Sequence, residues 1–124
     1  MAKILIIDDD ENFLKSMSEK LVSAKYEVVV ADDGDVGLKK TITEKPDLIL
    51  LDMMMPKVDG LTFLRKLKAE KDVPNIPIIV TSNMTSVDKI SEGIQFGIKG
   101  YIIKSNESLN TIVREIEKVL HQNS

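Results

Sequence analysis

The side chains with the clearest chemical potential in this sequence are aspartates that follow short apolar runs. Asp52 ends the apolar run that begins after Asp47, and three consecutive aspartates, Asp8 to Asp10, end the apolar run 4–7. A carboxylate can act as a nucleophile, and neighbouring carboxylates repel one another unless a cation relieves the repulsion. The spacing therefore places a first candidate site on Asp52 and adds a second acidic group near the amino terminus.

A simpler structural role is open for each of these aspartates. Asp52 could form a turn by accepting hydrogen bonds from the backbone that follows it. Asp8, Asp9 and Asp10 could cap the next helix, where the helix dipole favours negative charge. The repulsion among three adjacent carboxylates favours a metal-binding role for Asp8 and Asp9, whereas Asp10 is expected only to begin the helix.

Length and composition indicate an ordinary globular domain. The chain has 124 residues, of which 43% are hydrophobic and 30% charged, enough for one domain with its own core. The net charge is -3 without a visible basic stripe, so direct binding of nucleic acid is not expected. The absence of cysteine excludes disulfides and thiolate chemistry. The first apolar run is too short for a signal peptide or a membrane span, so a cytoplasmic location without a membrane partner is expected.

Strand-like and helix-like segments alternate along the chain. The expected strands are 4–7, 26–31, 47–52, 76–80 and 101–103. Apolar residues recur at helical spacing between them. Those expected on apolar helical faces are Phe13, Leu14, Met17, Leu21 and Val22; Val36, Leu38 and Ile42, which the second helix is expected to bury; Leu61, Phe63, Leu64 and Leu67; Val87, Ile90 and Ile94; and Leu109, Ile112, Val113, Ile116 and Leu120. Pro46 is expected to stop the second helix, and Thr85 with Asp88 forms a capping-box-like start for the fourth.

This alternation favours a parallel sheet with helices on both faces. The run 47–52 carries no charge between its two aspartates, which is typical of a strand covered on both sides. Right-handed crossovers point all strands the same way, so polar residues at their carboxyl ends should meet at one edge. Those residues are Asp8, Asp9, Asp10, Asp52, Thr81, Ser82 and Lys104. No repeat, low-complexity tract or linker divides the chain, so residues 1–124 are expected to form one domain.

Five motifs in order give the chain a specific resemblance. They are Asp8-Asp9, Asp52-Met53-Met54-Met55-Pro56, Gly60, Thr81 and Gly100-Tyr101-Ile102-Ile103-Lys104. Together they resemble the receiver domain of bacterial two-component response regulators, of the single-domain chemotaxis-regulator type, over essentially the whole chain. The resemblance implies an α/β, flavodoxin-like, doubly wound fold with a five-stranded parallel sheet in the order 2-1-3-4-5 and five helices.

The resemblance implies that Asp52 is a phosphoacceptor. It would take a phosphoryl group from a sensor histidine kinase or a phosphotransfer protein and form an aspartyl phosphate. The implied cofactor is Mg²⁺, held by Asp8, Asp9, Asp52 and the backbone carbonyl of Met54. Mg²⁺ prefers oxygen ligands, and the sequence has no histidine or cysteine cluster that would favour zinc.

Three further roles follow from the same resemblance. Lys104 would stabilise the charge that develops on the transferred phosphoryl group. Thr81 would donate its hydroxyl to a phosphoryl oxygen, and Tyr101 would be the aromatic switch whose ring turns inward when Thr81 moves. The readout surface would be formed by the fourth helix, the fifth strand and the fifth helix, where a downstream protein would bind. This makes the chain a phosphoacceptor that could dephosphorylate itself, rather than an enzyme.

Other functions fit the sequence less well. A flavodoxin-type FMN binder would need hydroxyl residues and glycine after the first strand, where this chain has three aspartates. A phosphatase of the haloacid dehalogenase type would place its nucleophile after the first strand and a second aspartate two residues later; here the position two residues after Asp52 is Met54. The alternative that stays open is a receiver-fold binding module that signals without phosphorylation.

The chain departs from the family after Lys104, where Ser105 stands in place of the usual proline. A cis peptide bond before proline costs about 0.5 to 1 kcal/mol, and before another residue about 2.5 to 4 kcal/mol. A trans Lys104–Ser105 bond is therefore expected. Ser105 or Asn106 is then expected to cap the last helix, while Lys104 should still reach Asp52.

Overall fold

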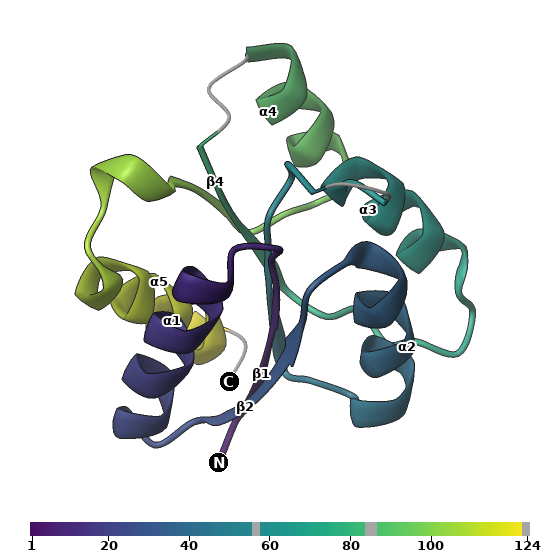
Figure 1. Cartoon of the computed structure of the whole chain (residues 1–124). Helices are drawn as coiled ribbons and strands as arrows, with labels where there is room; N and C mark the ends of the chain where they lie inside the picture. The colour runs from purple at the N-terminus through teal and green to yellow at the C-terminus, as the bar shows by residue number, and fades with distance from the viewer. Residues whose placement is uncertain (56–57, 84–86, 123–124) are drawn as a thin grey trace.

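Five parallel strands form one sheet in the order β2-β1-β3-β4-β5, as the sequence predicts (Figure 1). The computed structural model describes residues 1–55, 58–83 and 87–122. The strands are β1 (Lys3–Ile7), β2 (Glu27–Ala31), β3 (Leu48–Leu51), β4 (Ile78–Ser82) and β5 (Gly100–Ile103). The helices are α1 (Glu11–Ser23), α2 (Gly34–Glu44), α3 (Gly60–Ala69), α4 (Val87–Gln95) and α5 (Leu109–Gln122), with a 3-10 turn, η1 (Lys104–Asn106), after β5.

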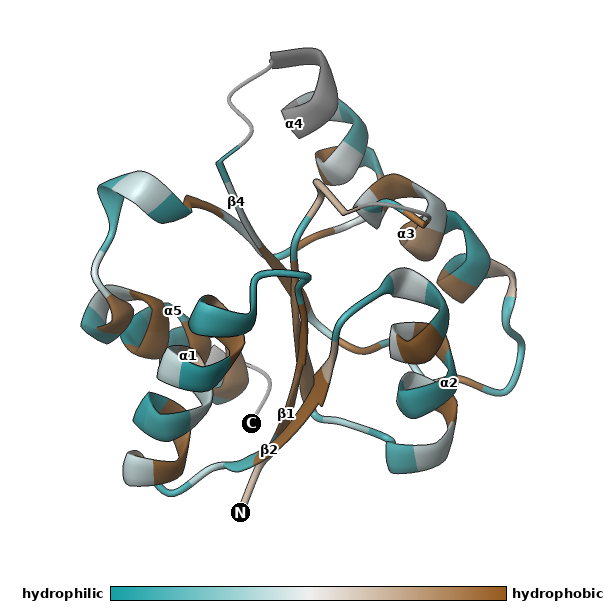
Figure 2. Ribbon diagram, in the orientation of Figure 1, coloured by the Kyte–Doolittle hydropathy of each residue, from teal (hydrophilic) through white to brown (hydrophobic). Residues whose placement is uncertain are grey.

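Helices cover both faces of the sheet, with α1 and α5 on one side and α2 and α3 on the other (Figure 1). Alternate strand residues supply the two cores: Ile4 and Ile6 pack with Met17 of α1, while Leu5 packs with Phe63 of α3. Figure 2 shows the result, apolar strands between helices whose outer surfaces are largely polar. Burial on both faces explains why the strands appear in the sequence as uninterrupted apolar runs.

Val36 and Leu38 of α2 pack against the core as predicted, but the fully buried positions of this helix are small residues and the prediction that Ile42 is buried is wrong. Ile42 is 41% exposed, and the buried positions of α2 are Gly34, Gly37 and Thr41. A Cβ atom added to Gly37 would come within 2.6 Å of Cδ1 of Ile7. The helix therefore approaches β1 closely along a face that hydrophobicity does not reveal. Ile42, one position further round the helix, lies outside it.

Two other residues expected on apolar helical faces are exposed. Val22 and Ile94 are each 61% exposed, and Val22 follows the buried Leu21 by one position, which turns its side chain away from the core. The cap expected at Thr85 and the side chains of 87–90 lie outside the described residues. None of the described helices combines the length and apolar composition that a membrane crossing requires.

Strand β4 lies two residues later in the sequence than the predicted 76–80. Pro77 has no N–H to donate to a ladder, although its carbonyl accepts a hydrogen bond from Ile49 (3.0 Å). At the other end, Thr81 and Ser82 belong to the strand and pair with β5. Both residues are therefore fixed by backbone pairing instead of lying in the loop that follows.

Candidate functional site

Asp52 is held at the carboxyl end of β3 by backbone pairing and by the loop that follows. Its N–H donates to the carbonyl of Ile7 (2.9 Å), and its Oδ1 accepts from the N–H of Met54 (3.0 Å). Met53 and Met55 are buried and anchor this loop, whereas Met54 is exposed. Asp52 itself is only 5% exposed. Asp52 therefore does form the turn considered above. This role uses only its Oδ1, which leaves Oδ2 for other contacts.

The three acidic residues after β1 have different surroundings. Asp8 is fully buried, and its Oδ1 accepts from the N–H of Asp10 (2.9 Å). One carboxylate oxygen from each of Asp8, Asp9 and Asp52 lies within 4.8 Å of the others. Asp10 caps α1 by accepting from two backbone N–H groups of the first turn, which confirms its helix-start role.

Lys104 reaches into this group of carboxylates from the end of β5. Its Nζ lies 2.5 Å from Oδ2 of Asp8 and 3.7 Å from Oδ2 of Asp52, so it reaches Asp52 as expected but is closer to Asp8. The same Nζ lies 4.4 Å from the centre of the Phe13 ring, and only 13% of the Lys104 side chain is exposed. Lys104 is therefore a partly buried cation shared by two carboxylates.

Thr81 carries a buried hydroxyl in the strand next to β3. Leu51 pairs with Val80, so the same register places Thr81 beside Asp52. Thr81 is 1% exposed, and its Oγ1 has no hydrogen-bond partner among the described residues. An unsatisfied buried hydroxyl costs about 1 to 3 kcal/mol, which a ligand oxygen could recover by accepting its hydrogen bond.

Tyr101 lies on β5 opposite Val80 and is half-buried against the core on the α2 and α3 side. Burial raises the pKa of its phenol, while a hydrogen bond with the Ser82 side chain acts in the opposite direction. Ser82 is fully buried. The aromatic residue proposed as a switch therefore contacts the residue that directly follows Thr81.

Burial dominates the electrostatics of the carboxylates. It raises the pKa of Asp52 to about 6; the Met54 N–H opposes this, the charge of Asp8 adds to it, and Lys104 opposes it in turn. Burial likewise raises the pKa of Asp8, although its contact with Lys104 favours the ionised form. The buried carboxylates of Asp8 and Asp52 share one ammonium group, and the exposed Asp9 lies beside them, so this cluster carries excess negative charge.

The donor set fits a hard divalent cation. Asp8, Asp9 and Asp52 offer oxygen ligands only, which is the preference of Mg²⁺, and a cation would relieve their excess charge. Met54, the fourth predicted ligand, lies in the loop whose N–H binds Asp52, and its carbonyl stays a prediction. Because Met54 would use its backbone, its exposed side chain is compatible with that role.

The loop after β5 follows the expected peptide geometry but a different capping pattern. The Lys104–Ser105 bond is trans, as are the other described peptide bonds. Ser105 and Asn106 belong to η1 and do not cap α5. The cap is Ser108, whose Oγ accepts from the N–H of Thr111 (3.2 Å). The prediction of the capping residue was wrong because η1 moves the start of α5 to Leu109.

Two contributors to the site were missed from the sequence. Phe13 was assigned only to the apolar face of its helix, yet its ring contacts Lys104. Asn83 follows β4 directly, and its Oδ1 accepts from the N–H of Ser105 (3.0 Å). The carboxyl-edge rule that selected Thr81 could have been extended to Asn83, whereas no sequence pattern signals the Phe13 contact.

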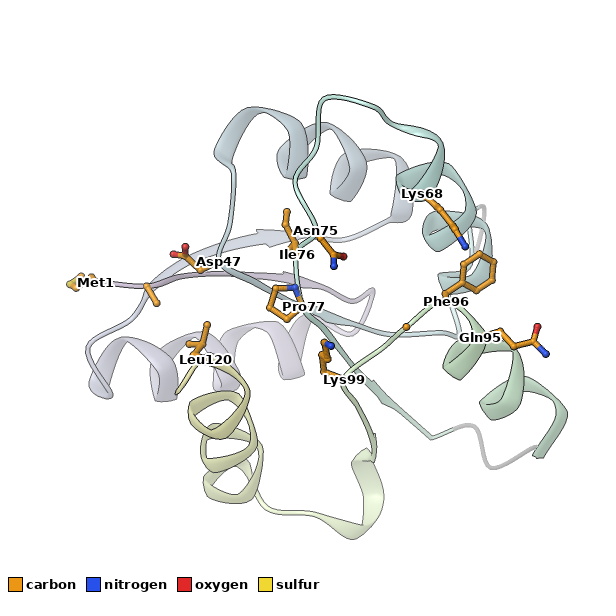
Figure 3. Close-up of a pocket in the computed structure, with 12 residues that line it drawn as sticks. Met1, Asp47, Lys68, Asn75, Ile76, Pro77, Gln95, Phe96, Lys99 and Leu120 are labelled. Atoms are coloured by element: carbon orange, nitrogen blue, oxygen red, sulfur yellow. The ribbon is translucent and has the colours of Figure 1, made fainter. Parts of the chain in front are cut away.

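A pocket of about 980 Å³ lies at the opposite edge of the sheet (Figure 3). Asp47, Pro77 and Lys99 line it, near the amino ends of β3, β4 and β5. Asp47 and Lys99 are exposed, and none of the acidic-site residues lines this pocket. This pocket is therefore separate from the carboxylate cluster of Asp8, Asp9 and Asp52 at the carboxyl edge.

The buried Asp52 carboxylate should make stability depend on pH when divalent cations are absent. Its folded-state pKa of about 6 lies above its usual value of 3.8, so between these values the folded protein holds a proton that the unfolded chain has released. The free energy of unfolding should therefore fall by about 1 to 3 kcal/mol as the pH rises through this window. Urea unfolding in a chelating buffer at a series of pH values measures it.

Asp52→Asn is the matched control for this prediction because it removes the ionisable group and keeps the shape. Its free energy of unfolding should vary less across the same window and exceed that of the wild type near neutral pH. A difference between the two proteins that stays constant with pH would contradict the prediction.

Comparison with known proteins gives the same assignment as the motifs. The response regulator receiver domain family matches residues 4–117. The alkaline phosphatase synthesis transcriptional regulatory protein PhoP of Bacillus subtilis (strain 168) is 37% identical over 116 residues, which are 92% of this chain and 48% of PhoP. The response regulator ArlR of Staphylococcus aureus (strain Mu50 / ATCC 700699) is 35% identical over 104 residues, 84% of this chain and 46% of ArlR. The chain thus spans about half the length of these curated relatives.

Solved structures extend the similarity to the fold. The chemotaxis protein CheY4 of Vibrio cholerae superposes with a TM-score of 0.88 at 30% identity, covering 96% of this chain and 98% of that one. A CheY-like receiver domain protein from Methanospirillum hungatei JF-1 gives a TM-score of 0.91 at 27% identity, covering 98% and 95%. With the strand order, the carboxylate cluster and the matched range in agreement, the chain belongs to the response regulator receiver domain family of two-component systems.

Proposed function

We propose that Asp52 accepts a phosphoryl group from a sensor histidine kinase or a phosphotransfer protein, and that residues 1–124 act as one receiver domain. Mg²⁺ would be held by Asp8, Asp9, Asp52 and the carbonyl of Met54. The resulting change would alter a protein-binding surface on α4, β5 and α5. With a net charge of -3, output through protein contacts is favoured over direct contact with nucleic acid.

One observation carries the proposal: Asp52 is buried at the carboxyl edge among Asp8, Asp9 and Lys104. Such an arrangement provides a nucleophile, a cation and a set of oxygen ligands in one place. The buried Thr81 hydroxyl without a described partner adds a donor beside Asp52. If Asp52 only formed the turn, its hydrogen bond with the N–H of Met54 would be sufficient, and the surrounding carboxylates, ammonium group and hydroxyl would have no role.

The transfer itself needs little covalent chemistry from the protein. An oxygen of Asp52 attacks phosphorus, an O–P bond forms, and the P–N bond of the phosphohistidine breaks. The departing imidazole nitrogen keeps the electron pair and takes a proton from solvent. Mg²⁺, when bound, would neutralise negative charge on the carboxylates and on the phosphoryl oxygens. Lys104 places its ammonium where that charge develops, 3.7 Å from Oδ2 of Asp52 before transfer.

The switch would begin at Thr81. Its hydroxyl would donate to a phosphoryl oxygen and so satisfy a buried polar group. Any shift of Thr81 moves Ser82, whose side chain is hydrogen-bonded to Tyr101 on β5. This path would connect the acceptor to the surface of α4, β5 and α5.

The wild-type chain is expected to gain one phosphoryl group from acetyl phosphate or phosphoramidate, and only when Mg²⁺ is present. Intact-mass measurement of samples with Mg²⁺ and with a chelator tests this, because the carboxylates need a cation before a second anion can approach. No gain in mass with Mg²⁺ present would overturn the proposal and favour the receiver-fold binding module.

Beryllofluoride, a phosphoryl mimic, supplies the second arm of the same experiment. With Mg²⁺, amide chemical-shift changes should extend from the loops around Asp52 to β5 and α5. Changes confined to those loops would contradict the proposed readout surface while leaving phosphoryl uptake intact.

A further inference from the structure

We propose that Phe13 and Asn83 are positioning residues for Lys104, a role that rests on the proposed function of Asp52. Two separate contacts lead to this inference. Phe13 lies against the Lys104 ammonium, and Asn83 binds the backbone one residue beyond it. Neither residue is one of the carboxylates that form the acidic cluster.

The Phe13 contact fixes the ammonium from the side of α1. The distance of 4.4 Å from Nζ to the ring centre is within the range of about 6 Å in which a cation is attracted to an aromatic face. Phe13 is itself placed by the start of α1, because its N–H donates to Oδ1 of Asp10 (3.2 Å). The ring therefore belongs to the same turn as the acidic residues after β1.

The Asn83 contact fixes the backbone that carries Lys104. The last register pair of β4 and β5 joins Ser82 to Ile103, and the hydrogen bond from Ser105 to Asn83 continues the connection beyond it. Lys104 lies between these two attachments. A proline at 105 would have no N–H to donate, so this hydrogen bond requires a residue other than proline at this position, and the chain has serine there.

Lys104 needs such fixing because a lysine side chain is flexible and has two carboxylate partners here. Nζ is nearer to Asp8, at 2.5 Å, than to Asp52, at 3.7 Å. The Phe13 and Asn83 contacts do not involve Asp8. They would therefore persist when Asp8 binds a cation, and keep the ammonium within reach of Asp52.

The test uses Phe13→Leu and Asn83→Ala in the full chain. Each should slow phosphoryl uptake from phosphoramidate, at saturating Mg²⁺, by about three- to tenfold. Phe13→Tyr keeps an aromatic face and should restore most of the rate. Asn106→Ala is the matched amide control, since Asn106 lies exposed in the same turn η1 and should leave the rate unchanged.

A Lys104→Ala background separates positioning from general structural damage. If Phe13 and Asn83 act through Lys104, their substitutions should cause no further slowing in that background. Equal slowing with and without the lysine would overturn the proposal.

Two measurements on the unphosphorylated protein test the positioning role independently of phosphoryl uptake. The ε-methylene protons of Lys104 should show an upfield ring-current shift that Phe13→Leu removes. The amide of Ser105 should exchange slowly with solvent, and faster in Asn83→Ala but not in Asn106→Ala. Absence of both signatures would overturn the positioning role, whereas their presence without phosphoryl uptake would contradict only the proposed function.

Discussion

Asp52→Ala is expected to take up no phosphoryl group under conditions in which the wild-type chain takes up one. The expected loss is complete because the other nearby carboxylates are poorly placed to substitute. Asp8 is paired to Lys104 and to a backbone N–H, and Asp9 is exposed to solvent. Removing Asp52 should not unfold the protein, since burial raises the pKa of this group and its charge therefore opposes folding at neutral pH.

Intact-mass measurement after incubation with phosphoramidate and Mg²⁺ provides the readout. Asp47→Ala is the matched control, because Asp47 is the exposed aspartate directly before the same strand, and its Oδ2 accepts from the N–H of Lys3 (2.7 Å). This control should be phosphorylated like the wild type. Full uptake by Asp52→Ala would show that another side chain is the acceptor.

The parts of this protein that could be predicted are those governed by rules of periodicity and direction. Doubly covered strands give uninterrupted apolar runs, and parallel strands bring their carboxyl ends together. These two rules were enough to place Asp8, Asp52 and Lys104 at one edge, where the ammonium group of Lys104 lies within 4 Å of both carboxylates. Asp10 was likewise assigned to helix capping by charge and position alone.

The errors arose where packing uses something other than hydrophobicity. In α2, apolar spacing correctly selects Val36 and Leu38, but the fully buried positions are Gly34, Gly37 and Thr41, and the same spacing wrongly selects Ile42. The end of β4 was missed for a different reason: Thr81 is polar, but its strand continues because β5 offers a partner. Pairing between distant segments is not visible in local sequence.

Contacts between individual side chains were the least predictable part of the site. The cap of α5 depends on η1, which forms after β5 and shifts the helix start to Leu109. The Phe13 ring and the Asn83 amide reach the site from segments about 70 residues apart, so only the three-dimensional fold juxtaposes them with Lys104. Gly60 was selected as a motif residue, and the structure now supplies its physical reason.

Gly60→Ala is expected to lower the free energy of unfolding by about 3 kcal/mol or more. A Cβ atom at this position would lie 2.5 Å from Sδ and 2.6 Å from Cα of Met53, and 2.9 Å from the carbonyl oxygen of Asp52. Two of these three atoms belong to the backbone, so a rotamer change cannot remove the overlap. The N–H of Gly60 also donates to the carbonyl of Met53 (3.2 Å), which ties the start of α3 to this loop.

Urea unfolding followed by circular dichroism measures the change, with Gly93→Ala as the matched control. In α4, a Cβ atom added to Gly93 would lie 3.2 Å from Cδ1 of Ile98, a movable side-chain end, and alanine favours a helix by up to about 1 kcal/mol. Gly93→Ala should therefore be near neutral or slightly stabilising. Because the overlap at Gly60 falls on the backbone that carries Asp52, Gly60→Ala should also slow phosphoryl uptake in the fraction that remains folded. Equal free energies of unfolding for Gly60→Ala and Gly93→Ala would contradict this prediction. They would mean that the loop after β3 can move to accommodate the Cβ atom, and that its close contact with α3 does not fix Asp52.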